Sequence, residues 1–400
     1  MTKSGLKILM LSWEYPPCVV GGLSRHVYSL SVHLAKAGHE VHVVTAGNEG
    51  LPTFEVINGV HVHRVIPVNE QDESFLAWIA GLNLAMAFEG EQLAKMVEFD
   101  LIHAHDWLVG ASALLLKELL SIPLLSTIHA TEHGRNNGIH TEIQRFIHER
   151  ERQLILESDH VIVCSDYMRE SLSSIFFVEQ NKISVLPNGI DSASVQVKVG
   201  EIFPKLKQRK YIFSIGRMVR EKGFDTIIEA ASIAKQRNLN YYFIVAGKGP
   251  MLANYQKQIE KMGLTEYVNF IGFVTDEQRS VLISGCEMAV FPSLYEPFGI
   301  VALETMVFGK PTIVSNTGGL QGIVQHLQTG LLMNLGSAQS LLDQVTYLKE
   351  NPKKSKEIGT KGKNIALSLY GWKRIASESA NLMMDLVLDR QIHENEGILR

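Results

Sequence analysis

Short apolar runs recur along the chain, and stretches with helical periodicity lie between many of them. In the first half, the runs that predict buried strands are Lys7–Ser12, Val41–Thr45, Val60–Val65, Leu101–Ala104, Leu124–Ile128, Val161–Cys164 and Ile183–Leu186. Apolar residues repeat at helical spacing from Leu23 to Leu34, which predicts a helix over Leu23–Ala37. Strands that alternate with helices are typical of an α/β protein with a parallel sheet covered on both faces.

The same pattern restarts in the second half of the chain. Residues Asp191–Lys210 lack clear periodicity and contain Gly200 and Pro204, so we expect a linker there. The strands predicted after it are Tyr211–Ile215, Tyr242–Ala246, Val268–Ile271, Met288–Phe291 and Pro311–Val314, and the helices are Phe224–Gln236, Met251–Lys261 and Asp276–Ser284. The pattern therefore predicts two α/β domains, in agreement with a length of 400 residues, which exceeds the ~250–300 that one core supports.

Composition and charge narrow the class of protein. A content of 46% hydrophobic and 20% charged residues is typical of a globular protein, and a net charge of −4 argues against a nucleic-acid binder. Three widely spaced cysteines fit reduced thiols in the cytoplasm better than disulfides. The apolar run Phe75–Phe88 is shorter than the ~18 residues of a membrane span, so we interpret it as a buried or interdomain helix, with an interfacial or ligand-facing surface as the alternative.

The most informative stretch runs from Met288 to Leu320. The predicted strand Met288–Phe291 is followed by a polar segment, and Pro297 then opens a helical pattern, which would place Glu296 at a helix start where backbone N–H groups bind anions. Glu304 follows eight residues later, roughly 12 Å away if the segment is helical. Two carboxylates that cleave one glycosidic bond lie ~5–9.5 Å apart, so this spacing favours groups that hold two ends of an elongated ligand.

Two cations lie at the end of another predicted strand. Arg217 and Lys222 belong to the loop between Tyr211–Ile215 and the next helix, where a diphosphate could be neutralised by a guanidinium and an ammonium. We interpret Arg220 and Glu221 in the same loop as ordinary surface charges. In the first half, Gly21 and Gly22 lie between a strand and a helix, where they serve a tight turn or let backbone N–H groups approach a phosphate.

Histidines mark the ends of two strands in the first half. His129 follows Leu124–Ile128, and His133 and Arg135 follow it as candidate ligand or phosphate contacts. A metal site at His103, His105 and Asp106 is an alternative, but alternate strand positions followed by a loop acid are usually structural. We therefore expect no metal site and interpret Asp106 as a candidate ligand contact. No D-x-D motif occurs, and Gly247–Pro250 lacks the third glycine of a dinucleotide fingerprint, so we expect no cofactor.

Taken together, these motifs resemble those of family-4 retaining glycosyltransferases. The motifs that carry the resemblance are E-P-F-G at 296–299 with Glu304, T-G-G-L at 317–320, G-R at 216–217, E-K-G at 221–223 and G-G-L at 21–23. W-E-Y-P-P at 13–17 and H-D-W at 105–107 look like the glycogen synthase and maltose-1-phosphate synthase branch. Bacterial glycogen synthases carry K-T-G-G-L where this chain has Val19–Leu23, so the resemblance selects neither the nucleotide nor the acceptor.

The resemblance implies a GT-B fold, in which two Rossmann-like domains face one another across a ligand cleft. Residues 1–195 would form the acceptor-side domain, rejoined by a C-terminal helix at about 374–400, and residues 206–373 would bind the nucleotide-sugar. The implied reaction is a retaining, metal-independent transfer of a hexose, with glucose expected, to a sugar, glucan or other hydroxyl acceptor. The nucleotide-sugar is then a substrate rather than a cofactor.

The resemblance also implies a role for each site residue. Arg217 and Lys222 would stabilise the departing diphosphate, Glu296 and the turn Pro297, Phe298 and Gly299 would hold the sugar, and Glu304 would bind the ribose. His129 would lie beside the donor sugar, and Gly21 and Gly22 would approach the donor. Asp106 would contact the acceptor or the donor sugar, and His133 and Arg135 would contact the acceptor or a phosphate. Two alternatives stay open: a nucleotide-sugar 2-epimerase on the same fold, and a non-catalytic glucan-binding relative. The sequence leaves open the nucleotide, the exact sugar, the acceptor, the oligomeric state and the pathway.

Overall fold

The computed structural model describes residues 5–19, 21–69 and 74–398, with side chains up to residue 392. Val20 of the Val19–Leu23 segment lies outside the described residues. The chain divides into two compact units: Met1–Gly189 together with Trp372–Arg400 forms unit 1, and Ile190–Gly371 forms unit 2. Each unit is a Rossmann-like α/β domain, which confirms the predicted fold class, and each is described by itself.

Unit 1 contains an eight-stranded sheet in the order β3-β4-β2-β1-β5-β6-β7-β8. Its strands are β1 (Lys7–Ser12), β2 (Glu40–Ala46), β3 (Phe54–Ile57), β4 (Val60–Val65), β5 (Leu101–His105), β6 (Leu124–Ile128), β7 (His160–Val163) and β8 (Ile183–Val185). All neighbours pair in parallel except β3 and β4, which form an antiparallel hairpin at the sheet edge. The sequence did not predict β3, because its apolar positions Phe54 and Val56 are exposed rather than buried.

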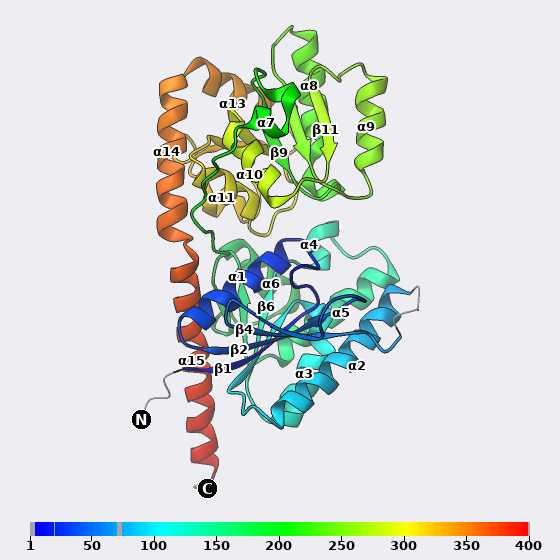
Figure 1. Cartoon of the computed structure of the whole chain (residues 1–400), viewed down its shortest axis with the longest axis vertical. Coiled ribbons are helices and arrows are strands. Elements are labelled where there is room, and N and C mark those ends of the chain that lie inside the picture. Colours follow the sequence, from blue (N-terminus) through cyan, green and yellow to red (C-terminus); the bar gives the residue numbers. More distant parts are fainter. Residues whose placement is uncertain (1–4, 20, 70–73, 399–400) are drawn as a thin grey trace. The chain divides into compact units, whose positions relative to one another are not determined.

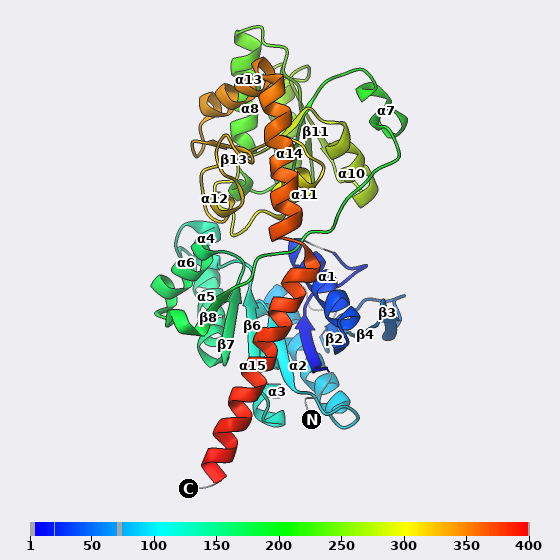
Figure 2. The ribbon, with the colours of Figure 1, turned by 90° about the vertical axis from the view of Figure 1, so that its left-hand side faces the viewer.

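The helices of unit 1 cover both faces of this sheet (Figures 1 and 2). They are α1 (Gly22–Lys36), α2 (Phe75–Ala94), α3 (Gly110–Leu120), α4 (Glu132–Asn136), α5 (Glu142–Glu157), α6 (Asp166–Phe176) and α15 (Trp372–Ile398), with 3₁₀ turns η1 (Trp107–Val109) and η2 (Gln180–Lys182). Helices α1 and α15 pack side by side on one face, and α2 and α3 pack on the other. The last helix of the chain therefore completes the first unit.

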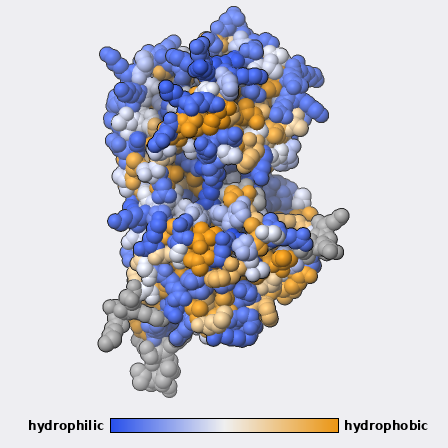
Figure 3. Space-filling view, viewed as in Figure 1, coloured by the Kyte–Doolittle hydropathy of each residue, from blue (hydrophilic) through white to orange (hydrophobic). Residues whose placement is uncertain are grey.

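Helix α2 contains the apolar run that the sequence left open between two interpretations. Asn83, which interrupts the run, is buried: its side chain donates to the carbonyls of Ile79 and Leu108 and accepts from the backbone of Ser112, so it ties α2 to η1 and α3. Leu84 and Phe88 face solvent, and apolar surface gathers over this part of unit 1 in Figure 3. Within the described residues, every helix is too short or too polar to cross a membrane.

Unit 2 contains a six-stranded, fully parallel sheet in the order β11-β10-β9-β12-β13-β14. Its strands are β9 (Ile212–Ile215), β10 (Phe243–Ala246), β11 (Val268–Gly272), β12 (Met288–Phe291), β13 (Thr312–Ser315) and β14 (Leu331–Met333). Its helices are α7 (Val199–Ile202), α8 (Phe224–Gln236), α9 (Leu252–Lys261), α10 (Asp276–Gly285), α11 (Ile300–Val307), α12 (Leu320–Ile323), α13 (Ala338–Glu350) and α14 (Pro352–Leu369), with 3₁₀ turns η3 (Pro204–Leu206) and η4 (Arg220–Lys222).

Two apolar cores hold the unit 2 sheet between its helices. Helices α8, α9 and α13 contribute to the larger core, and α10 contributes to the smaller one together with the segment before β9. That segment was predicted as a linker, but it carries α7 and η3, and Leu206 is buried against the sheet. The helical turns are four and three residues long, too short to produce a periodic signal.

In both units the strand order reverses beside the first strand of the sheet. In unit 1, β1 lies between β2 and β5, and in unit 2, β9 lies between β10 and β12. Ligands of open α/β sheets bind outside the carboxyl ends of the strands at such a switch point. The segments after β1 and β5 and after β9 and β12 lie at these switch points, and His129 follows the neighbouring strand β6.

Trp372 anchors α15 on unit 1 and provides a test of this arrangement. Its side chain is buried in the core formed by α1, α15 and the sheet, and its ring packs against those of His26 and His33. Replacement of a buried tryptophan by alanine costs roughly 3–5 kcal/mol, so Trp372→Ala should lower the free energy of unfolding by about that amount in chemical denaturation. Leu388→Ala, at an exposed position of the same helix, should leave it nearly unchanged. Equal effects would contradict the described packing.

Candidate functional site

The candidate site of unit 2 is formed by the loops that follow β9 and β12. We call the group Arg217, Glu221, Lys222, Ser293 and Glu296 the β9–β12 corner. Lys222 Nζ donates to Glu296 Oε2 at 2.7 Å, and Ser293 Oγ donates to the same oxygen at 3.1 Å. The side chains of Lys222 and Glu296 are only 19% and 10% exposed. An ion pair so shielded from water is electrostatically stronger than a surface pair, and the contact joins two residues 74 positions apart.

The loop after β9 is held to the loop after β12 by its backbone as well. The carbonyl of Glu221 accepts hydrogen bonds from the backbone N–H groups of Leu294 and Tyr295, at 2.8 and 3.3 Å. The Glu221 carboxylate accepts from Arg217 at 3.0 Å, and the Arg217 side chain is 47% exposed. Glu221 is thus a structural element of the corner, and its interpretation as an ordinary surface charge is wrong.

Glycines allow the close approach of these loops. Gly223 has a φ of 66°, and a Cβ there would overlap the carbonyl oxygen of Pro292. Gly318 and Gly319 pack directly on the Glu296–Phe298 turn, where the Gly319 N–H donates to the Glu296 carbonyl at 2.9 Å. The T-G-G-L segment therefore supports the backbone of the E-P-F-G turn.

The helix after Glu296 starts later than the sequence predicted. Helix α11 begins at Ile300, because Gly299 adopts a φ of 113°, which a right-handed helix cannot contain. Pro297 and Phe298 form a turn, and the Phe298 ring is buried and packs against Tyr370. Glu296 therefore precedes the helix by a full turn of chain, and the estimate of 12 Å along one helix axis does not apply.

Glu304 lies on α11 and has a partner that the sequence did not reveal. Arg279 Nη2 lies 3.4 Å from Glu304 Oε1, and the two side chains are 15% and 11% exposed. Arg279 belongs to α10, a helix that the sequence gave no reason to connect with the E-P-F-G segment. The contact fixes one carboxylate oxygen of Glu304, and its expected role toward a ribose stays a prediction.

In unit 1, the ends of β5 and β6 carry the residues predicted for that half. Asp106 follows β5 with a φ of 61°, and its carboxylate accepts the backbone N–H of His129 at 2.8 Å. His129 Nε2 lies 3.2 Å from His105 Nδ1. The structure thus brings Asp106 and His129 together, and the contact gives Asp106 a positioning role that the sequence did not predict.

Burial governs the charge states of this region. It raises the pKa of Asp106 to about 6, against the effects of Arg135 and two backbone hydrogen bonds. Desolvation also lowers the pKa of His103 and of His129 to about 3, and nearby Arg135 contributes at His129. The pKa values of His26 and His105 are likewise lowered by burial. These imidazoles are therefore neutral at pH 7 and can accept a hydrogen bond.

Helix α4 carries His133 and Arg135. Thr131 caps its first turn, and the Glu132 N–H donates to Glu151 Oε1 of α5 at 2.8 Å. Glu151 is buried, and burial raises its pKa to about 8. The sequence did not single out Glu151, because one acid within a polar helix gives no signal of burial.

Gly21 and Gly22 open α1 as predicted, but the Gly21 N–H already has a protein acceptor. It donates to Glu14 Oε2 at 3.1 Å, and Glu14 is buried in the loop after β1. Gly22 is the first residue of α1. The glycines thus serve a closed turn, and their approach to a donor stays a prediction.

The raised pKa of Glu151 predicts a specific pH dependence of stability. A carboxyl group whose pKa is higher in the folded state stabilises the protein fully below its unfolded pKa of about 4.5, and this contribution is lost as the pH rises toward 8. Glutamine does not ionise, so Glu151→Gln does not lose this contribution as the pH rises. The free energy of unfolding of the variant, relative to that of the unmodified protein, should therefore increase between pH 5 and pH 9, by up to a few kcal/mol. Thermal unfolding across this range measures the difference.

Glu149→Gln, at an exposed position of the same helix, is the matched control and should follow the unmodified protein at every pH. A constant difference between Glu151→Gln and the unmodified protein across the range would contradict the assignment.

Comparisons with known proteins cover both units. A family model described as Glycosyltransferase Family 4 matches residues 20–194, and one described as Glycosyl transferases group 1 matches residues 200–365. A glycosyltransferase of Methanocaldococcus jannaschii is 33% identical over 388 residues, which cover 94% of this chain and 97% of that protein. The glycogen synthase of Mycobacterium tuberculosis is 32% identical over 397 residues, with coverages of 95% and 94%.

The fold has solved counterparts. Sucrose-phosphate synthase from Thermosynechococcus elongatus superimposes with a TM-score of 0.84 and covers 96% of this chain and 100% of its own. The sequence identity is 23%, so this likeness concerns the architecture of the chain.

Proposed function

The chain belongs to glycosyltransferase family 4, and on this premise we propose that it transfers a hexose from a nucleotide diphosphate sugar to a hydroxyl acceptor. The expected hexose is glucose. The transfer would retain the configuration of the sugar and would need no metal ion at the diphosphate. The observation that carries the proposal is the β9–β12 corner, in which the cationic loop and the E-P-F-G turn meet through Lys222 and Glu296.

The β9–β12 corner has unused hydrogen-bond donors that could bind a diphosphate. Lys222 carries three N–H donors and uses one on Glu296, and Arg217 carries five and is nearly half exposed. Helix α8 begins directly after this loop, at Phe224, and its N-terminus adds positive potential. The acids Glu221 and Glu296 pair with Arg217 and Lys222 and keep both cations oriented. The charges of these four side chains sum to zero, so attraction for a diphosphate would come from the unused N–H donors and the helix N-terminus.

The steps follow from these donors. As the bond between the sugar and the diphosphate breaks, negative charge grows on the leaving phosphate, and preoriented donors stabilise that charge more than they stabilise the ground state. Glu296 and the Pro297–Gly299 turn are assigned to the sugar hydroxyls and Glu304 to the ribose. His129, held through its backbone by Asp106, is assigned to the donor sugar, and the leaving phosphate assists deprotonation of the acceptor on the same face of the sugar.

The acceptor is the least constrained part of the proposal. Glycogen synthase and sucrose-phosphate synthase act with different acceptors by their names, so neither identity transfers to this chain. We assign Asp106, His133 and Arg135 to the acceptor side. We further assign the reaction to the cytoplasm, a choice compatible with the wide spacing of the three cysteines in the sequence.

Substitutions at the corner test the proposal. A thermal-shift panel of UDP, ADP and GDP first identifies the nucleotide, and transfer or hydrolysis of the corresponding glucose donor is then followed. Lys222→Ala should lower kcat/KM for the donor by roughly 10²–10³-fold, the range found when a transition-state donor is removed. Glu296→Ala should also lower it, because Lys222 loses the partner that orients it. Lys349→Ala is the control, because Lys349 and Glu287 form an ion pair with the same 2.7 Å separation and similar burial elsewhere in unit 2.

Loss of one partner leaves a shielded charge unpaired, so each variant is first shown to be folded by thermal unfolding and assayed well below its Tm. Unchanged rates in Lys222→Ala and Glu296→Ala, or an equal loss in Lys349→Ala, would contradict the assignment. NMR of the product reports the anomeric configuration. Conversion of the donor sugar without an acceptor would identify an epimerase instead.

A further inference from the structure

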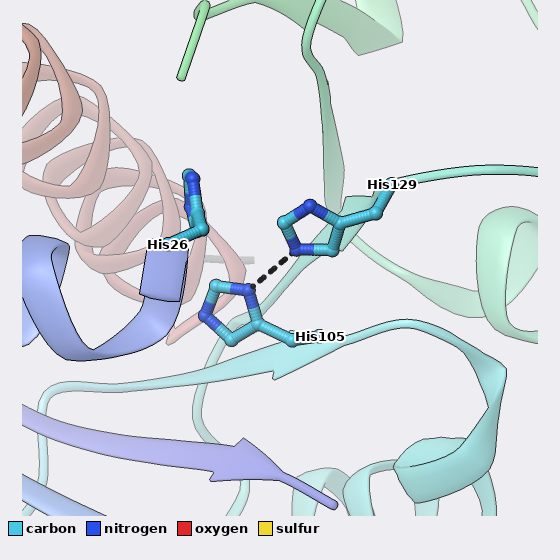
Figure 4. A group of neighbouring side chains, drawn as sticks. All are labelled: His26, His105 and His129. Atoms are coloured by element: carbon cyan, nitrogen blue, oxygen red, sulfur yellow. Dashed lines mark hydrogen bonds between the residues drawn. The ribbon is translucent and has the colours of Figure 1, made fainter. Parts of the chain in front are cut away.

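Three histidines from separate elements of unit 1 converge on one point (Figure 4). His26 lies on α1, His105 ends β5, and His129 follows β6. One ring nitrogen from each lies within 4.8 Å of the other two. The ring of His26 lies edge-on to both others, with centroids 4.8 Å from His129 and 5.5 Å from His105.

We propose that His26, His105 and His129 form a binding site for a zinc ion, with a fourth position left for water or another ligand. Imidazole nitrogens bind zinc at ~2.0–2.1 Å, so two ligands of a tetrahedral ion lie roughly 3.4 Å apart. His105 Nδ1 and His129 Nε2 are already 3.2 Å apart. The longest separation in the group, 4.8 Å, must shorten by roughly 1.4 Å, which rotation of a side chain can supply.

The hydrogen bonds of His26 prepare it as a ligand. Its Nδ1 lies 2.6 Å from the amide oxygen of Asn188, which can only accept, so Nδ1 carries the proton and Nε2 carries the lone pair. Histidines that bind metals usually donate their other ring N–H to such an acceptor. His26 is 5% exposed, and its Nε2 is buried without a hydrogen-bond partner among the described residues. A bound cation would satisfy this lone pair.

The facing ring nitrogens of His105 and His129 already have the separation expected of two ligands of one zinc ion. The two facing nitrogens share a single proton, whereas a bound zinc ion requires both lone pairs. The proton then moves to the far nitrogen of whichever ring carries it, and both rings stay neutral. His105 Nε2 is buried and has no partner among the described residues, so no contact fixes its tautomer. His129 is partly exposed, which gives an ion and its fourth ligand access.

A second histidine pair in the same unit shows the same spacing with protein partners at all of its ring nitrogens. His42 Nδ1 lies 3.1 Å from His63 Nε2, almost the same separation. The outer nitrogens of this pair, however, face carboxylates: His42 Nε2 lies 3.1 Å from Glu40, and His63 Nδ1 lies 3.4 Å from Glu89. This pair therefore serves as an internal control, because it has the spacing of the proposed site without an unpartnered buried nitrogen. A third ring, that of His61, stacks on His42 with centroids 4.5 Å apart, but among the described residues these three histidines do not form a group whose nitrogens converge.

Metal binding by the full-length protein tests the site directly. After treatment with a chelator and dialysis, zinc is titrated by calorimetry, and cobalt is titrated by the visible absorption of tetrahedral Co²⁺. The unmodified protein should bind one ion. His26→Gln and His105→Gln should each weaken binding by at least about 100-fold, and Asn188→Ala should weaken it by roughly 10–100-fold, as loss of an outer-shell partner does. His63→Gln should bind as the unmodified protein does.

No binding by the unmodified protein, unchanged binding in both His26→Gln and His105→Gln, or an equal loss in His63→Gln would overturn the proposal. X-ray absorption at the zinc edge of the unmodified protein gives an answer that needs no variant. It should show three imidazole nitrogens at ~2.0 Å, whereas a shell of oxygens with fewer imidazoles would refute the site.

The inference stands apart from the proposed transferase reaction. Both would use His129, so zinc should inhibit transfer if both are right. The binding measurements, however, contain no nucleotide-sugar, and the transfer assay is run on metal-free protein. Failure of one can therefore be told from failure of the other.

Discussion

The ion pair between Lys222 and Glu296 is the contact on which the proposed chemistry depends. It joins two loops that leave adjacent parallel strands, β9 and β12, at the reversal of strand order in unit 2. A cation and an anion shielded from water are costly unless they are paired and hydrogen-bonded, and here Ser293 adds a bond to the same carboxylate oxygen. The pair holds the loop of Arg217 and Lys222 against the E-P-F-G turn before any ligand arrives, which would reduce the reorganisation that the proposed binding and reaction require.

In unit 1, too, carboxylates hold neighbouring segments in place before any ligand is bound. Asp106 leaves β5 in a left-handed conformation and fixes the backbone of His129 at the end of β6, while Glu151 fixes the start of α4. In each unit a carboxylate from one loop holds a neighbouring segment through a buried or half-buried hydrogen bond. Residues assigned to substrates are thus held in place by neighbouring carboxylates, of which Asp106 is itself assigned to the acceptor side and Glu151 has no predicted contact with a ligand.

The sequence predicted the sheets well, because buried parallel strands appear as short apolar runs; β1, β4, β6 and β12 have the predicted bounds. It also singled out Arg217, Lys222 and Glu296, because they belong to local motifs; the structure places them in one corner, and their roles toward a substrate stay predictions. It missed Arg279, Glu151 and the convergence of His26 with His105 and His129, since these depend on which elements become neighbours. The start of α11 was predicted too early, because Pro297 suits a first helical turn and only the backbone at Gly299 shows that the turn continues.

The central claim is that the β9–β12 corner binds the diphosphate of a nucleotide-sugar. A crystal structure of the protein with the nucleoside diphosphate that it binds most tightly tests this claim most directly. The account predicts phosphate oxygens within hydrogen-bond distance of Lys222 Nζ and the Arg217 guanidinium, with the Lys222–Glu296 contact retained. A nucleotide bound elsewhere, with neither cation touching a phosphate, would contradict it.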